Sequence, residues 1–213
     1  MSPATPPATP PTKAALRAML LAARRAVPES VRATEARQLA THLADALGSL
    51  TGGARAVCAY LPVGSEPGSP ELLDRLGELC DEVLLPVIAD GDDQPLSWGR
   101  YVPGTLVTAR FGLREPSGPR LAPEAIRQVD LVLVPALAVD RTGVRLGRGG
   151  GFYDRSLPLC APGTPLLAVV RDDEVVGELP HEPHDVLMTH ALTPGAGLIR
   201  LRECHPADSG SST

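Results

Sequence analysis

The sequence is poor in aromatic residues and in cysteine, and it carries no excess of positive charge. Only 3% of its 213 residues are aromatic, and acidic residues outnumber basic ones, so the formal net charge is −5. Proteins that bind nucleic acid or anionic lipid usually present a basic face, so the composition predicts neither partner. The cysteines form no CxxC pair and no zinc-ligand spacing, which is typical of reduced thiols in a cytoplasmic protein. They are Cys58, Cys80, Cys160 and Cys204.

Long apolar runs are also missing. No segment approaches the roughly 20 apolar residues that a membrane-spanning helix needs, and the N-terminus has neither the charged nor the apolar part of a secretory signal. Residues 1–11 are rich in proline, and residues 205–213 are small and polar. The sequence therefore predicts one soluble, cytoplasmic domain over residues 12–204, between two disordered tails, with no membrane partner.

Several familiar catalytic motifs are absent. There is no Gly-Lys-Ser/Thr of a Walker loop and no dinucleotide-binding fingerprint with its later acidic residue. No Ser-His-Asp or Cys-His arrangement can be found from spacing. The two histidines of His181-Glu-Pro-His184 are separated by a proline and lack a third strong ligand, so a transition-metal site is not expected.

Hydrophobic periodicity predicts two N-terminal helices followed by an α/β alternation. The first helix starts at Thr12, and its predicted inward face consists of Leu16, Met19, Leu20, Ala23 and Val27. The second runs over 29–47 and stops at Gly48. Strands are predicted over 54–61, 82–88, 96–101, 131–139, 166–170 and 197–202, and further helices over 70–80 and 151–157.

The most informative segment is Asp140–Asp154, which holds five glycines and three arginines directly after a buried strand. Glycines let phosphate oxygens approach backbone N–H groups closely, and the helix that follows adds the positive end of its dipole. Arg145 and Arg148 can bind phosphate, and Asp154 could hold a magnesium ion that bridges phosphates. The alternative is a flexible surface loop with solvated arginines.

Three other places could contribute to a ligand site. Lys13 and Arg17 lie four residues apart on the first helix, although such pairs often simply face water. Glu66 follows the first strand in a loop that would face the same crevice as the glycine-rich segment, and it could accept hydrogen bonds from a heterocycle. Asp185 is a second possible oxygen ligand for magnesium.

The few aromatic side chains could form flat walls for a pterin or purine ring, although core packing is the default for each of them. These side chains are Phe152, Tyr153, Trp98 and Phe111.

Read in order, five elements resemble the 5-formyltetrahydrofolate cyclo-ligase family, also called methenyltetrahydrofolate synthetase. These elements are Lys13-x-x-Leu-Arg17, Tyr60-Leu-Pro-Val-Gly-Ser-Glu66, Phe111-Gly-Leu-Arg-Glu-Pro116, Arg145-Leu-Gly-Arg-Gly-Gly-Gly-Phe-Tyr-Asp154 and His184-Asp185. The resemblance covers nearly everything between the two tails, and five elements in the correct order are far more specific than any one of them.

The resemblance implies a three-layer α/β/α, Rossmann-like fold with a mostly parallel sheet and two N-terminal helices. It implies a ligase that uses ATP and Mg²⁺ to convert the small molecule 5-formyltetrahydrofolate to 5,10-methenyltetrahydrofolate, with release of ADP and phosphate. In this chemistry the formyl oxygen takes the γ-phosphoryl group, N10 attacks the formyl carbon, and phosphate leaves. We expect such an enzyme to be a monomer.

The resemblance also assigns residues. Arg145 and Arg148 would be catalytic, and Asp154 and Asp185 would hold magnesium. ATP would contact Lys13, Arg17, Arg145, Leu146, Gly147, Arg148, Gly149, Gly150, Gly151, Phe152 and Tyr153. The folate would contact Leu61, Glu66, Arg148 and Tyr153.

The chain departs from the family pattern at two positions. Many members have lysine where this chain has Gly150, and many have aspartate where it has Thr189. Two alternatives remain: a non-catalytic member of the fold that only binds nucleotide or folate, and a small-molecule kinase with an unusual phosphate loop. The presence of Lys13, Glu66 and Asp154 favours the enzyme over the binding module.

Overall fold

The computed structural model describes residues 11–88 and 93–201 of the chain. The predicted tails, 1–11 and 205–213, therefore lie outside the described residues except for Pro11. No helix in the described ranges is long and apolar enough to cross a membrane. Of the four cysteines, Cys204 lies outside these ranges, and the other three are free thiols, as predicted.

Two helices come first, as predicted. Helix α1 spans Lys13–Ala26, and the Thr12 side chain caps it by accepting a hydrogen bond from the Ala15 N–H at 3.2 Å. Helix α2 spans Glu29–Thr51. The prediction that α2 stops at Gly48 is wrong, because a glycine inside a helix is tolerated at a cost of about 1 kcal/mol, whereas Gly52 takes the left-handed conformation (φ 68°) that ends a helix.

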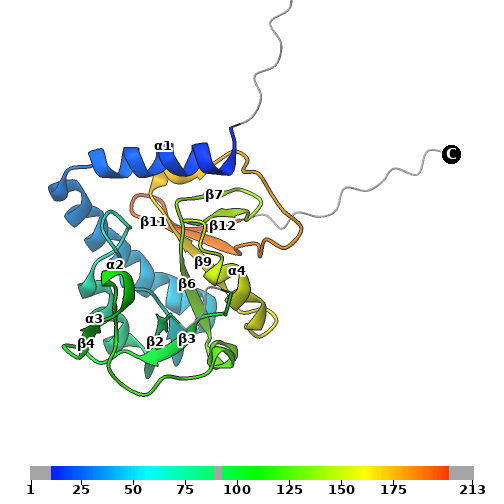
Figure 1. The fold of residues 1–213 in the computed structure, drawn as a ribbon. Coiled ribbons are helices and arrows are strands. Elements are labelled where there is room, and N and C mark those ends of the chain that lie inside the picture. The colour runs from blue at the N-terminus through cyan, green and yellow to red at the C-terminus, as the bar shows by residue number, and fades with distance from the viewer. Residues whose placement is uncertain (1–10, 89–92, 202–213) are drawn as a thin grey trace, which may run out of the picture.

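A seven-stranded sheet forms the centre of the molecule, in the order β12-β11-β9-β6-β1-β2-β3 (Figure 1). The inner strands run parallel, and the two edge strands are antiparallel to their neighbours. The strands are β1 Ala56–Cys58, β2 Glu82–Val87, β3 Ser97–Arg100, β6 Leu131–Pro135, β9 Leu166–Val169, β11 His190–Thr193 and β12 Gly197–Arg200. Strand β11 was not predicted, and the strands that were predicted are shorter than expected.

Alternating side chains of the inner strands divide the core in two. In β6, Leu131 and Leu133 point to the face covered by α2 and α3, whereas Val132 and Val134 point to the opposite face. The elements outside the sheet are α3 Pro70–Leu79, α4 Phe152–Ser156, and the 3₁₀ helices η1 Arg110–Gly112, η2 Pro123–Gln128, η3 Leu157–Leu159 and η4 Asp172–Glu174. The predicted three-layer α/β fold is confirmed, with short helices making up the layer that includes η2, α4 and η3.

Two small sheets lie beside the main one. The first has the order β10-β7-β8 and the second pairs β4 with β5. Their strands are β4 Leu106–Thr108, β5 Arg114–Pro116, β7 Ala138–Asp140, β8 Arg145–Leu146 and β10 Val175–Val176. Leu16 and Leu20 of α1 pack on the small cluster of Ala138, Val144 and Leu146. This packing places α1 beside the segment that carries the glycines.

The sequence predicts a single strand over 131–139, and this prediction is wrong. The run forms two strands that belong to different sheets. Strand β6 ends at Pro135, which has no N–H with which to continue a ladder, and β7 then pairs with β8 and β10. The tight turn between β7 and β8 requires Gly143, because φ is +99° and a Cβ there would lie 2.5 Å from the Met188 carbonyl oxygen. The glycine loop therefore follows a hairpin and not a buried strand.

Candidate active site

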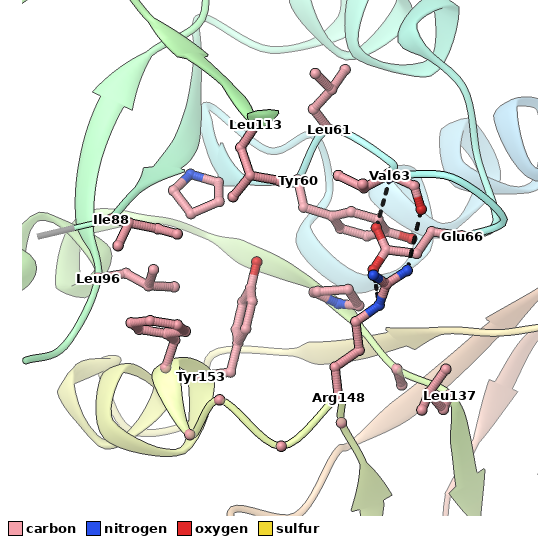
Figure 2. A pocket seen from close by; sticks show the side chains of 18 of the residues that line it. Tyr60, Leu61, Val63, Glu66, Ile88, Leu96, Leu113, Leu137, Arg148 and Tyr153 are labelled. Carbon is pink, nitrogen blue, oxygen red and sulfur yellow. Dashed lines mark hydrogen bonds and ion pairs between the residues drawn. The ribbon is translucent and has the colours of Figure 1, made fainter. Parts of the chain in front are cut away.

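A cavity of about 350 Å³ opens at the carboxyl ends of β1, β2 and β6 (Figure 2). Its walls include the loop after β1 (60–66), the end of β2 and the residue after it (85–88), the link between β6 and β7 (135–137), and the glycine loop with the start of α4 (147–154). Ligands of open α/β sheets bind outside the carboxyl ends of the strands. The prediction that the loop containing Glu66 faces the same crevice as the glycine loop is confirmed.

The cavity wall is largely apolar. Figure 2 shows Ile88 and Leu96 on one side of the space, with the ring of Tyr153 between them and Arg148, and Leu113 above that ring. Such a lining suits a flat ring system with a few polar groups. Leu61 and Leu137 also line the cavity.

Of the four predicted aromatic walls, Phe152 and Tyr153 line the cavity. Trp98 does not, because it is fully buried in the core and its Nε1–H donates to the Pro123 carbonyl oxygen at 3.1 Å. The side chain of Phe111 lies outside the described part of the chain.

Two arginines lie on the backbone of the glycine loop, Arg17 in ordinary contact and Arg155 so close that a side chain on the loop would collide with it. A Cβ at Gly149 (φ +100°) would lie 3.5 Å from the guanidinium carbon of Arg17, and one at Gly151 (φ +68°) would lie 2.5 Å from an Arg155 nitrogen. Helix α4, which follows the loop, has only five residues, or little more than one turn. The helix dipole that was predicted to attract an anion to the loop is therefore weak. The electrostatics of the loop therefore depend on side chains and on its own N–H groups.

Arg145 is fixed by two bonds at the edge of the cavity. Its Nη2 donates to the Asp154 carboxylate at 2.6 Å, and its Nη1 donates to the Pro135 carbonyl oxygen at 3.1 Å. The Arg145 side chain is only 6% exposed. Arg145, one of the two predicted catalytic arginines, and Asp154, one of the two predicted magnesium ligands, thus form an ion pair with each other in this structure.

Arg148 makes an ion pair across the mouth of the cavity. Its Nε lies 3.0 Å from a Glu66 oxygen, and its Nη2 donates to the Val63 carbonyl oxygen at 3.2 Å (Figure 2). Glu66 also accepts the Val63 N–H at 2.8 Å. The Arg148 side chain is 47% exposed, so this contact joins the glycine loop to the loop after β1 at the surface.

Arg17 bonds to a backbone carbonyl oxygen, whereas Arg145 and Arg148 are each paired with a carboxylate. Its Nε donates to the Gly147 carbonyl oxygen at 2.9 Å, and within the described residues it forms no ion pair with a carboxylate. Its positive charge is therefore not cancelled by a neighbouring carboxylate. Of the predicted phosphate-binding residues, Arg17 is the best placed to attract an anion onto the glycine loop.

Lys13 is held one turn earlier on the same helix. Its Nζ lies 3.1 Å from both Glu182 and Asp185. Burial lowers the pKa of Lys13, but the bonds to the two carboxylates outweigh this effect and raise it. Burial also disfavours the charged form of Asp185, which raises its pKa. The hydrogen bond from the Glu182 N–H and the charge of Lys13 outweigh burial, so the pKa of Asp185 is lowered overall. Both groups are thus charged near neutral pH.

The two predicted magnesium ligands are in different surroundings. Asp154 lines the cavity, whereas Asp185 does not and is already bonded to Lys13. No cluster of three or more acidic, histidine or cysteine side chains able to hold a metal exists among residues 11–88 and 93–201. Magnesium bound with nucleotides takes one or two carboxylates and completes its shell with phosphate and water. The single carboxylate of Asp154 fits that role.

Sequence reasoning missed one charged residue of the cavity. Arg24 lines the wall although it is 1% exposed, whereas the predicted inward residue Met19 is 60% exposed. The less exposed stripe of α1 contains Lys13, Arg17 and Arg24 together with Leu16, Leu20 and Leu21, whereas Ala23, also predicted to face inward, is exposed. A spacing of four and seven residues between the three cations was the available signal, because these positions share one helix face.

The two departures from the family pattern have local explanations here. A Cβ on Gly150 would lie 3.0 Å from the Phe152 ring, so a longer side chain would have to displace that ring. The Thr189 hydroxyl accepts the Leu166 N–H at 2.9 Å and donates to the Leu166 carbonyl oxygen at 3.1 Å. Thr189 therefore ties together the segments that begin β9 and β11.

The sheet and its cavity define an α/β protein in which an apolar wall and arginine side chains line one cavity. The model of the 5-formyltetrahydrofolate cyclo-ligase family matches residues 10–194. The chain belongs to this family, which is a family of enzymes.

Relatives and solved structures agree with this assignment. The 5-formyltetrahydrofolate cyclo-ligase of Mycolicibacterium smegmatis is 58% identical over 182 residues, which are 84% of this chain and 92% of the relative. The structure of Aquifex aeolicus 5,10-methenyltetrahydrofolate synthetase has a TM-score of 0.70 and 29% identity, and the match covers 94% of this chain and 95% of that one. A Mycoplasma pneumoniae 5,10-methenyltetrahydrofolate synthetase, at 19% identity and a TM-score of 0.65, shares the fold over 83% of this chain and 94% of its own.

Proposed function

We propose that this enzyme converts 5-formyltetrahydrofolate to 5,10-methenyltetrahydrofolate with ATP, and releases ADP and phosphate. The main support for this reaction is that the glycine loop and an apolar wall line the same cavity, which is large enough for a ring system. Arg17 lies against the glycine loop at Gly149. The name of the Mycolicibacterium smegmatis relative, which this chain matches over 92% of that relative's length, supports the reaction.

In this proposal the ATP phosphates lie on the glycine loop. Arg17 supplies positive charge without a competing carboxylate, and the N–H groups of the loop supply hydrogen bonds. Arg145 is held rigidly by Asp154 and Pro135, so it can stabilise charge that develops on the transferred group. Lys13, one turn before Arg17, would contact the same phosphates.

Magnesium would bind at Asp154 together with phosphate oxygens, where it would neutralise part of the phosphate charge. Because Asp154 also holds Arg145 at 2.6 Å, the cation and the guanidinium would share one carboxylate. Asp185 would act through Lys13 or through water, since it lies outside the lining of the cavity.

The folate would occupy the apolar part of the cavity. Leu61 and Tyr153 line it, and Glu66 could accept N–H groups of the pterin. In the structure Glu66 is paired with Arg148, so we propose that ligand binding opens this pair. Each partner then becomes available, Glu66 to the pterin and Arg148 to phosphate.

The chemistry needs alignment and charge stabilisation more than it needs a protein nucleophile. The formyl oxygen attacks the γ-phosphorus, and the bond from that phosphorus to ADP breaks. N10 then adds to the formyl carbon and loses its proton, and the carbon–oxygen bond breaks so that the oxygen leaves as part of inorganic phosphate. Positioning and fixed positive charge are the usual contributions of a protein to phosphoryl transfer.

Purified protein incubated with ATP, Mg²⁺ and 5-formyltetrahydrofolate tests the proposal. We expect the methenyl chromophore to form together with equal amounts of ADP and phosphate. A stable phosphorylated product would instead support the kinase, and binding of both ligands without turnover would support the non-catalytic module. Either result would refute the proposed reaction.

We also propose that the enzyme works as a cytoplasmic monomer on small molecules, without nucleic acid or membrane partners. The net charge of −5 is unfavourable for binding to polyanions. Sedimentation of the purified protein with and without ATP would test the monomer, and a dimer required for turnover would contradict it.

A further inference from the structure

Arg24 has one unused nitrogen in the wall of the cavity. Its guanidinium is held by three bonds, from Nε and Nη2 to the two Glu174 oxygens at 2.6 and 2.7 Å and from Nη2 to the Ala136 carbonyl oxygen at 2.6 Å. Within the described residues its Nη1 is buried and has no hydrogen-bond partner. Two N–H donors of a side chain that lines the cavity are therefore left without an acceptor.

Such a donor is costly unless something binds it. An unsatisfied buried group of a charged side chain costs several times what one hydrogen bond contributes to stability. The buried hydroxyl of Tyr153, in the same cavity, likewise has no partner among the described residues. Arg171 Nη1 is a third unsatisfied donor, but Arg171 does not line the cavity. Arg24 and Tyr153 both line one cavity, and this shared position points to a ligand that brings oxygen acceptors.

The position of Arg24 on α1 relates it to the proposed phosphate site. Lys13, Arg17 and Arg24 share one face of the helix, and the eleven residue steps from the first to the last span roughly 16 Å at the rise of an α-helix. Arg17 lies over Gly149 of the glycine loop, whereas Arg24 lies at Ala136, behind the apolar wall. One helix therefore contacts both halves of the cavity.

The charge around Arg24 selects the kind of acceptor. Glu174 is 5% exposed and cancels the Arg24 charge through a two-bond contact, so the pair is neutral as a unit. A neutral donor in an apolar wall matches a carbonyl oxygen, because a phosphate would lose its water there without gaining a net opposite charge. Arg17, which has no such carboxylate, suits the phosphate.

We propose that Arg24 is a substrate-binding residue whose Nη1 donates to a neutral carbonyl oxygen of the folate. The inference rests on the proposed function and deepens it, since it assigns the last turns of α1 to the folate and the first turns to ATP. Folates offer two such oxygens near the reacting atoms, the ring carbonyl and the formyl group. Glu174 is a positioning residue that holds the donor in place.

The test uses Arg24→Lys, which keeps a positive charge opposite Glu174 but lacks the forked second nitrogen. Arg25→Lys is the matched control, because Arg25 is the next residue of α1 and is exposed. A second variant, Arg24→Met with Glu174→Leu, removes donor and carboxylate together and so leaves no buried unpaired charge. Melting curves establish that each variant is folded before the Kd values of ATP and of 5-formyltetrahydrofolate are measured.

We expect the Kd and KM for 5-formyltetrahydrofolate to rise about 10- to 100-fold in folded Arg24 variants, as for loss of a bond to a charged donor. The Kd for ATP should change less than about threefold, and Arg25→Lys should match the wild type. Binding of tetrahydrofolate, which lacks the formyl group, identifies the acceptor. If the Arg24 variants lose as much affinity for tetrahydrofolate as for 5-formyltetrahydrofolate, the acceptor is the ring carbonyl. If they bind tetrahydrofolate as tightly as the wild type does, the acceptor is the formyl oxygen.

Unchanged folate affinity in both Arg24 variants, or an equal loss for ATP and folate, would overturn the inference. The wild type separates this failure from that of the proposed function. If the wild type turns over 5-formyltetrahydrofolate while the variants bind it normally, only the role of Arg24 is wrong. If the wild type neither binds nor converts the folate, the function itself is wrong.

Discussion

Two arginine–glutamate pairs on one cavity differ mainly in burial. Arg24 and Glu174 are 1% and 5% exposed and are joined by two bonds, whereas Arg148 is 47% exposed and meets Glu66 through one nitrogen at 3.0 Å. A buried pair loses several kcal/mol when one partner is removed, because the other charge is left out of water. An exposed pair contributes about 1 kcal/mol or less. The buried pair can therefore shape the cavity, and the exposed pair can open.

Removal of Glu174 should have the largest effect on stability. Glu174→Ala leaves Arg24 buried without its counter-charge, so we expect the free energy of unfolding to fall by about 3–5 kcal/mol. Urea denaturation at neutral pH measures it. Glu78→Ala, which breaks the ion pair with Arg75, serves as a comparison, because both of these side chains are at least half exposed. A loss below 1 kcal/mol for Glu174→Ala would show that the two pairs on the cavity do not differ as burial predicts.

Removal of Arg148 should separate activity from stability. Arg148→Ala leaves Glu66 bonded to the Val63 N–H, so the melting curve should be nearly unchanged. If Arg148 moves to the phosphates, loss of its charge should lower kcat/KM by about 10²- to 10³-fold. Steady-state kinetics beside thermal unfolding provide both values. Full activity in a protein that melts normally would remove Arg148 from the mechanism.

Substitutions at Asp154 should change how the activity depends on magnesium. Asp154→Ala is expected to abolish turnover. The chain should still fold, at some cost in stability, because Arg145 is only 6% exposed and keeps just its bond to the Pro135 carbonyl oxygen. Asp154→Asn keeps a hydrogen-bond acceptor for Arg145 and should therefore separate the metal from the arginine. We expect this variant to need more Mg²⁺ for half-maximal ATP binding. An unchanged Mg²⁺ dependence would assign the metal to other groups.

The Lys13–Asp185 pair lies between the two extremes, with side chains 20% and 12% exposed, and should give the smallest effect. The pKa of Asp185 is lowered in the folded protein from its ordinary value of 3.8, because the Glu182 N–H and Lys13 outweigh the effect of burial. Its stabilisation is therefore complete above that ordinary pKa and is lost as the pH falls through the lowered one. Unfolding measured from pH 6 to 3 should show a shallower acid loss in Asp185→Asn, and identical profiles would contradict this sign.

Local patterns in the sequence predicted much of the site, because Glu66 follows the parallel strand β1 and faces the edge where parallel strands end. The glycine loop reaches the same edge by another route, since it follows the β7–β8 hairpin that leaves the end of β6. Arg24 was missed because its burial depends on Glu174, which is 150 residues away in the chain. The split of the run 131–139 was missed because hydrophobicity alone does not distinguish one long strand from two short strands in different sheets.

Transfer of an isotope tests the central claim most directly. If the γ-phosphoryl group goes to the formyl oxygen, 5-formyltetrahydrofolate labelled with ¹⁸O in that oxygen must give inorganic phosphate that carries the label, one atom for each methenyl product. Unlabelled phosphate, with the ¹⁸O retained in the folate or released as water, would contradict the account.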